Sequence, residues 1–196
     1  MKILVAGMHK SGSTALFNII RLCFKDVYSS WCDYYNEKNE SKIHLVKTHS
    51  YSKELMEWAD IIFTTKRDMK DSTASIKRFL MAEKIPYNFD KYLKLNTEYY
   101  EDWKEYSDYE FVYEQYIEDP IKIINEIALM LNVSIDAELI YSMLGELISD
   151  KSLVFGDHTN HMITSKNLIG KMIVGGHAEY LTKEEIDKVD SYIPQG

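Results

Sequence analysis

A segment near the amino end combines glycines, a lysine and hydroxyl residues in the order of a phosphate-binding loop. Residues 7–14 read Gly-Met-His-Lys-Ser-Gly-Ser-Thr, with two glycines five positions apart. This order matches the Walker A pattern G-x-x-x-x-G-K-S/T, except that Ser13 stands in the lysine position and Lys10 lies inside the loop. Glycines allow backbone N–H groups to surround an oxyanion, the next helix adds its dipole, and Lys10 adds positive charge. We therefore interpret the segment as a phosphate cradle rather than as a tight turn with a solvated lysine.

Two further motifs follow apolar segments that we interpret as strands. Lys47 and His49 end one such segment, and Arg67 follows another, with Ser75 eight residues beyond it. Taken alone, a histidine after a strand is more often structural than catalytic, and a charged run is most often an exposed helix start. In open parallel sheets, however, ligands bind beyond the carboxyl ends of the strands, which is where both motifs lie.

Together the three segments resemble the sulfotransferases that use 3′-phosphoadenosine 5′-phosphosulfate (PAPS). The loop 7–14 is similar to that family's 5′-phosphosulfate loop, and Arg67 with Ser75 resembles its 3′-phosphate-binding segment. Residues 47–49 resemble the Lys-Thr-His segment of its cytosolic members, in which the Lys and the His flank the transferred sulfuryl group. Residues 113–120 are similar to a Tyr-Glu and Asp-Pro stretch that marks the fold.

The resemblance implies a role for each matching residue. His49 would be the base, and Lys10 and Lys47 would neutralise the oxygens around the transferred group, so these three are the expected catalytic residues. Residues 165–170 align with the family's nucleotide-covering loop and keep its lysine. No metal is expected, because a sulfuryl group carries less charge than a phosphoryl group and the lysines can offset it. The expected donor-binding residues are Lys10, Ser11, Gly12, Ser13, Thr14, Arg67, Ser75 and Lys166.

The sequence departs from the family pattern at three places. Ala15 stands where a tryptophan often stacks on adenine, so other side chains must hold the base. Ser165 replaces the arginine of the covering loop, which weakens the grip on the 3′-phosphate unless Lys166 or Lys171 compensates. Other branches of the family use a carboxylate as the base, and Glu54 or another carboxylate is the alternative to His49 here.

Strand and helix patterns alternate along the chain. Apolar segments at 3–6, 42–47, 61–65 and 109–113 predict four strands. The alternation predicts an α/β fold with an open, mostly parallel β-sheet flanked by helices, which the resemblance narrows to the P-loop NTPase-like sulfotransferase fold, with residues 1–196 as a single sulfotransferase domain. Helices are predicted at 15–22, 52–58, 70–82, 86–107, 121–131 and 136–148, a long functional loop at 149–176, and a last helix from Thr182, with Glu185 completing a capping box.

Composition and charge limit the partners and the compartment. The chain has 196 residues, 31 acidic and 23 basic, for a net charge of −8, which argues against nucleic acid as the main partner. Cys23 and Cys32 are the only cysteines, which indicates free thiols in a reducing compartment. The apolar start is interrupted by His9 and Lys10, and no stretch approaches the roughly 20 apolar residues of a membrane span. We therefore expect a soluble cytoplasmic protein.

The resemblance implies an enzyme that moves the sulfuryl group of PAPS to an acceptor hydroxyl or amine, giving PAP and a sulfated product. The acceptor is a small molecule, a glycan or a lipid, and residues 87–109 and 155–163 are expected to line its pocket. Two alternatives stay open. One is a P-loop nucleotide or small-molecule kinase, whose magnesium would need Asp60, Asp68 or Asp71. The other is a nucleotide-binding regulatory domain without catalysis.

Overall fold

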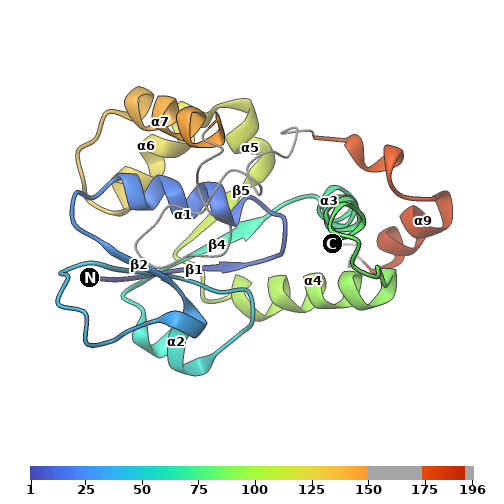
Figure 1. Ribbon diagram of the computed structural model, residues 1–196, viewed down its shortest axis with the longest axis horizontal. Helices are drawn as coiled ribbons and strands as arrows, with labels where there is room; N and C mark the ends of the chain where they lie inside the picture. Colours follow the sequence, from blue (N-terminus) through green and yellow to red (C-terminus); the bar gives the residue numbers. More distant parts are fainter. Residues whose placement is uncertain (150–173, 193–196) are drawn as a thin grey trace.

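A parallel β-sheet forms the centre of the protein (Figure 1). The computed structural model describes residues 1–149 and 174–192, and within them five strands pair in the order β2-β3-β1-β4-β5. Every pair of neighbouring strands is parallel, which confirms the predicted α/β class. The strands are β1 (Lys2–Gly7), β2 (Tyr28–Trp31), β3 (His44–Lys47), β4 (Ile61–Lys66) and β5 (Tyr109–Val112).

The central strand β1 is apolar on both faces because helices cover both faces of the sheet. Successive side chains of a strand point to opposite faces, so Ile3 and Val5 face one layer while Leu4 and Ala6 face the other. All four are fully buried. A strand buried on both sides reads as a continuous apolar run, which is the pattern that identified it in the sequence.

Two helical layers enclose the sheet. In Figure 1, α1, α5, α6 and α7 lie on one side of it, and α2 and α4 lie on the other. The buried indole of Trp103, on α4, fills the second layer, in which α4 packs against β1 and β4. The helices are α1 (Ser13–Leu22), α2 (Lys53–Trp58), α4 (Phe89–Lys104), α5 (Tyr113–Glu118), α6 (Pro120–Met130) and α7 (Ala137–Ser149), and a 3₁₀ turn, η1, spans Cys32–Tyr34.

Helix α3 (Met69–Ala82) carries the carboxy-terminal part of the described chain. The buried carboxylate of Asp71 accepts hydrogen bonds from the backbone N–H groups of Gly175 and His177, at 2.6 and 3.1 Å. Lys77 forms an ion pair with Glu185 at 2.8 Å. These contacts attach η2 (Gly176–Glu179) and α9 (Lys183–Tyr192) to α3, as seen in Figure 1.

Most predicted elements are present close to their expected bounds, and two were missed. The capping box at the start of α9 is confirmed, with Glu185 N–H donating to the Thr182 hydroxyl at 3.2 Å. The edge strand β2 and the short helix α5 were not predicted, and position 113 begins α5 rather than ending β5. The predicted loop 149–176 falls mostly outside the described residues.

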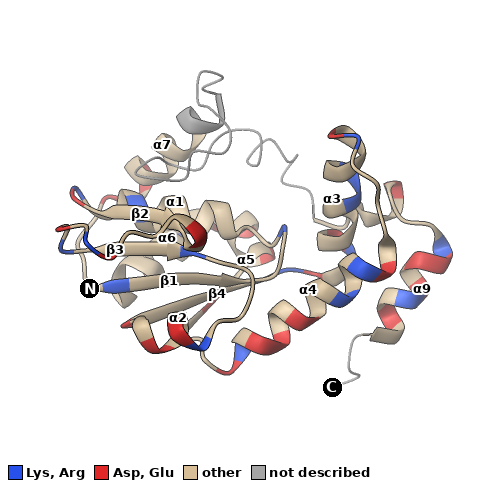
Figure 2. Cartoon of the chain, turned by 60° about the horizontal axis from the view of Figure 1, so that its bottom comes forward, with Lys and Arg blue, Asp and Glu red and all other residues tan. Residues whose placement is uncertain are grey.

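Charged side chains lie mainly on the outer helices. Figure 2 shows acidic and basic positions along α2, α4 and α9, while the strands carry few of either. No helix in the part of the chain that the structure describes has the length and apolar character needed to cross a membrane.

Candidate active site

The loop between β1 and α1 needs glycine at both ends. Gly7 has φ 110°, and a Cβ there would lie 2.8 Å from the carbonyl oxygen of Thr65 on the neighbouring strand. Gly12 has φ 87°, and its Cβ would lie 2.7 Å from the ring of Tyr113. Lys10 also adopts a left-handed conformation, with φ 55°. The loop therefore turns tightly around its own backbone, as an anion cradle requires.

Side chains from the neighbouring elements hold this loop in place. The buried Ser11 hydroxyl donates to the carbonyl of Met8 at 2.7 Å and lies 2.6 Å from the hydroxyl of Thr65. The guanidinium of Arg67 donates to the carbonyl of Lys10 at 3.0 Å. The Ser11 side chain thus stabilises the loop, so a contact to a bound phosphate would come from its backbone N–H.

The amino end of α1 points the helix dipole at this loop. Its N-cap is Gly12, which forms no side-chain cap. Ser13 and Thr14 occupy the first turn, and the Thr14 hydroxyl accepts a hydrogen bond from the Lys47 ammonium at 2.9 Å. Backbone N–H groups, a helix dipole and a cation converge here, and this combination binds phosphate and sulfate groups.

Burial makes both lysines of the site unusually acidic. Lys47 is 4% exposed, and burial, reinforced by the charge of Lys10, lowers its pKa to about 7. Burial, with a smaller contribution from Arg78, lowers the pKa of Lys10 to about 8. The Lys10 ammonium also lies 3.8 Å from the centre of the Phe79 ring. A bound anion would favour the charged form of both lysines.

His49 is held as a neutral imidazole of defined tautomer at the end of β3. Its Nδ1 lies 2.7 Å from the carbonyl oxygen of Gly7, so Nδ1 carries the hydrogen and Nε2 carries the lone pair. The indole of Trp103 donates to the His49 carbonyl at 3.0 Å. Burial, with the nearby His9 and Lys47, lowers the pKa of His49 well below its ordinary value. The His49 imidazole is therefore a base at the same edge of the sheet as the loop 7–14.

The residues expected to bind the 3′-phosphate lie at the end of β4 and on α3. The guanidinium of Arg67 stacks over the ring of Tyr113 at 4.2 Å. Ser75 lies about two turns into α3 and is partly exposed. Glu114 accepts a hydrogen bond from the backbone of Asp68 at 2.9 Å, which ties α5 to the start of α3. The Tyr-Glu motif therefore has a physical role, since it supports both Arg67 and the phosphate loop.

Two lysines near the end of β4 form ion pairs with carboxylates. Lys66 pairs with Glu110 at 3.6 Å, and Lys70 pairs with Asp190 at 2.8 Å. Lys10, Lys47 and Arg67 lie around the loop. Lys166 lies outside the described residues.

The arrangement of strands and helices matches solved sulfotransferase structures. The mouse sulfotransferase SULT7A1 complexed with PAP superposes with a TM-score of 0.69 at 16% identity, over 97% of this chain and 82% of that chain. The chain has the sulfotransferase fold. Retinol dehydratase gives TM-scores of 0.66, in complex with androsterone and inactive cofactor PAP, and 0.65, in complex with retinol and PAP. Those matches have 15% and 16% identity and cover 97% of this chain and 79% of the other.

The sequence itself matches neither a protein-family model nor a curated protein. The comparison of structures therefore shows the sulfotransferase fold, and the roles of individual residues must be argued from the geometry of this chain.

The aspartates that a kinase would need for magnesium have structural roles within this fold. Asp60 accepts a hydrogen bond from the backbone of Lys2 at 2.7 Å. Asp68 caps α3 by accepting the N–H of Asp71 at 2.9 Å. Asp71 binds the segment that contains His177. Each of these carboxylates therefore accepts a hydrogen bond from the fold itself, and Asp68, Asp71 and His177 offer ligand atoms that lie within 4.8 Å of one another.

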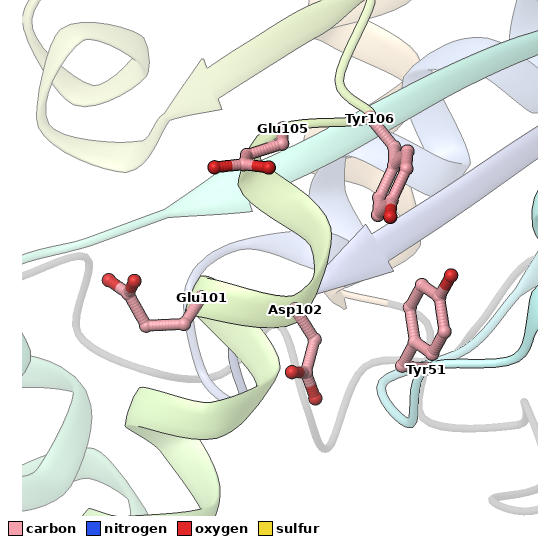
Figure 3. Close-up of a pocket in the computed structure, with 5 residues that line it drawn as sticks. All are labelled: Tyr51, Glu101, Asp102, Glu105 and Tyr106. Carbon is pink, nitrogen blue, oxygen red and sulfur yellow. The ribbon is translucent and has the colours of Figure 1, made fainter.

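A surface pocket of about 290 Å³ lies at the end of α4 (Figure 3). Its lining belongs mainly to the segment 87–109 that was expected to contact the acceptor. In Figure 3 the side chain of Tyr106 points toward Tyr51, and the two ring centres lie 5.8 Å apart. The acidic character of the pocket opposes binding of the anionic donor. The lining residues are Tyr51, Glu101, Asp102, Glu105 and Tyr106.

Sequence reasoning missed the polar residues that support the loop from behind. Asn96 on α4 and Ser72 on α3 are fully buried and contact the loop backbone. One signal was available for Asn96: with Leu93 and Trp103 it forms a stripe at spacings of three and seven residues, so an amide lies on the apolar face of a helix.

Proposed function

We propose that this chain is a sulfotransferase that transfers the sulfuryl group of PAPS to an acceptor hydroxyl or amine and releases PAP. The observation that carries the proposal is the convergence of His49 and Lys47 on the phosphate loop. His49 donates to the Gly7 carbonyl and Lys47 donates to the Thr14 hydroxyl, so the base and a cation contact opposite ends of one anion cradle. Sulfuryl transfer needs both groups at one place.

In the proposed mechanism, each residue acts through the atoms described above. His49 takes the proton of the acceptor at Nε2, while its Nδ1–H stays on the Gly7 carbonyl. Lys10 and Lys47 stabilise charge that develops on the bridging and nonbridging oxygens. When bound, PAPS supplies the activated sulfuryl group.

The donor is held at both ends in this proposal. The backbone of residues 11–14 and the dipole of α1 bind the 5′-phosphate, and Arg67 with Ser75 binds the 3′-phosphate. Lys166 is proposed to cover the nucleotide. The lysines and Arg67 offset the donor charge, so the reaction is proposed to need no metal.

The proposal extends to the setting of the enzyme. Residues 1–196 are proposed to form one sulfotransferase domain, and the acceptor is a small molecule, a glycan or a lipid rather than nucleic acid. A cytoplasmic location is supported by Cys23 and Cys32, which are both free thiols.

Ligand-induced thermal stabilisation separates this function from the alternatives. PAP without metal should raise Tm more than AMP does, with a stabilisation of about 2.7 kcal/mol at a hundredfold excess over Kd. Arg67→Ala should remove most of the preference for PAP while binding of AMP persists. Equal stabilisation by PAP and AMP, or a requirement for ATP with magnesium, would reject the proposal. Transfer of labelled sulfate from PAPS to a panel of acceptors then distinguishes an enzyme from a regulatory domain.

A further inference from the structure

Asn96 and Ser72 form a closed hydrogen-bonded ring around the backbone of His9. The side-chain oxygen of Asn96 accepts the His9 N–H at 2.7 Å, and its amide nitrogen donates to the Ser72 hydroxyl at 2.6 Å. That hydroxyl donates in turn to the His9 carbonyl at 2.6 Å. Both backbone polar groups of one loop residue are thus held by side chains from two different helices.

Burying this hydrogen-bonded ring costs free energy. Asn96 and Ser72 are both fully buried, and burying an amide or a hydroxyl is unfavourable unless each polar atom is hydrogen-bonded. An apolar residue at position 96 would continue the stripe made by Leu93 and Trp103. Packing alone therefore does not explain an asparagine here, whereas control of the loop backbone does.

What the ring holds in place is the part of the loop nearest the proposed chemistry. The next residue, Lys10, has φ 55°, a conformation that persists only where the surroundings enforce it. The His9 ring lies 4.0 Å from the His49 ring and 5.1 Å from the Tyr99 ring, measured between ring centres. A shift of the His9 backbone would move the His9 ring, against which the His49 imidazole packs.

We propose that Asn96 and Ser72 are positioning residues for sulfuryl transfer. They fix the backbone of His9, and through it the orientation of Lys10 and the placement of the His49 imidazole. The proposal rests on the proposed function, because it assigns Lys10 and His49 to the transfer step. It also joins α4, on the side expected to contact the acceptor, to α3, which carries the 3′-phosphate residues.

The test compares Ser72→Ala and Asn96→Asp with a matched control, Thr64→Val. The control removes another buried hydroxyl contact, between Thr64 and Ser107 at 2.7 Å, from the strand next to β1. With sulfuryl transfer from PAPS as the assay, Ser72→Ala and Asn96→Asp should each lower kcat about tenfold or more, while the Kd for PAP changes less than about threefold. The control should leave kcat unchanged, and the double variant should be no slower than the slower single variant, because both substitutions open one ring.

Hydrogen exchange provides a second readout that needs no catalysis. Amides of residues 8–14 should exchange faster in Ser72→Ala and Asn96→Asp than in Thr64→Val. Ser72→Ala removes one hydroxyl only, so it keeps the test decisive if Asn96→Asp fails to fold. Unchanged kcat and unchanged loop exchange in Ser72→Ala would overturn the proposal. If the unmodified protein binds PAP but transfers no sulfate, the proposed function fails, and the exchange experiment still decides whether the ring holds the loop.

Discussion

In the proposed mechanism, the Lys10 ammonium stabilises both the bound donor and the transition state. Lys10→Ala should weaken PAP binding and lower kcat, since a charge-assisted hydrogen bond contributes ~1.5 to 3 kcal/mol, or about tenfold and more. Calorimetry with PAP and a sulfate-transfer assay measure the two effects. Lys70→Ala is the matched control, because the Lys70 ammonium pairs with Asp190 on the surface. Near-normal turnover in Lys10→Ala would contradict the proposed role of Lys10 in the transfer step.

His49 should affect turnover far more than donor binding. His49→Ala is expected to reduce kcat about 10² to 10⁴-fold, the usual contribution of a general base, with PAP affinity nearly unchanged. Because burial keeps the His49 pKa well below its ordinary value, the acidic limb of the pH–kcat/KM profile should lie below pH 6.5 and disappear in the variant. His44→Gln, at the start of β3, is the control. An unchanged kcat would contradict the role of His49 as the base and make Glu54, which lies exposed on α2, the next candidate.

Lys47 makes donor binding depend on pH. Its pKa is about 7 in the free protein, and a bound anion raises that pKa, so at pH 8 PAP binding should take up protons. Calorimetry in two buffers of different ionisation enthalpy measures this uptake directly. In Lys47→Arg the side chain stays charged, so the uptake should fall. Equal uptake in both proteins would show that Lys47 does not change its protonation when PAP binds.

At the scale of the elements, the start of α1 tolerates no side chain. Gly12→Ala places a Cβ 2.7 Å from the Tyr113 ring and 2.9 Å from the Phe111 ring, in a left-handed backbone. We expect a lower Tm and loss of PAP binding. Gly145→Ala, in α7, is the control: its Cβ meets nothing within 4 Å, and alanine favours a helix interior by about 0.8–1.0 kcal/mol over glycine. A Gly12→Ala protein that is stable and binds PAP normally would contradict the cradle geometry.

The elements also show where sequence patterns succeed. The apolar runs of β1 and β4 are buried on both faces, so hydrophobicity alone predicted them. Strand β2 was missed because Ser29 and Ser30 fill buried positions with hydroxyl residues, which no apolar pattern reveals. Helix α5 was missed because it begins directly after β5 ends, with no turn residue between.

The candidate site was predictable only in part, for a similar reason. Gly7, Lys10, Lys47, His49 and Arg67 lie at strand ends or in a glycine-rich loop, where their type and spacing carry meaning. The partners that support them come from distant helices, and spacing along one chain does not reveal contacts between elements. Asn96 lies 87 positions from His9, and only the tertiary structure brings the two together.

For the whole molecule, the buried histidines should set an acid limit on stability. The pKa of His9 is lowered by burial, and also by Lys10, to about 4, against an ordinary 6.5. Between these values the unfolded chain binds more protons than the folded chain, so the free energy of unfolding should fall as pH decreases from 6.5 to 4. Urea titrations across this range measure the slope, which His9→Gln should make shallower. An identical slope in that variant would mean that other groups govern acid unfolding.

The hydrogen bond from Arg67 to the Lys10 carbonyl links the proposed binding site of the 3′-phosphate to the proposed binding site of the 5′-phosphosulfate. In the proposed mechanism, the residue that binds the 3′ end of the donor also supports the main chain of the residue that acts at its 5′ end. A nucleotide lacking the 3′-phosphate would forgo its contact with the guanidinium that supports the loop. Fidelity toward the donor would then appear in the rate of transfer as well as in affinity, so the enzyme could reject a near-analogue even after that analogue has bound.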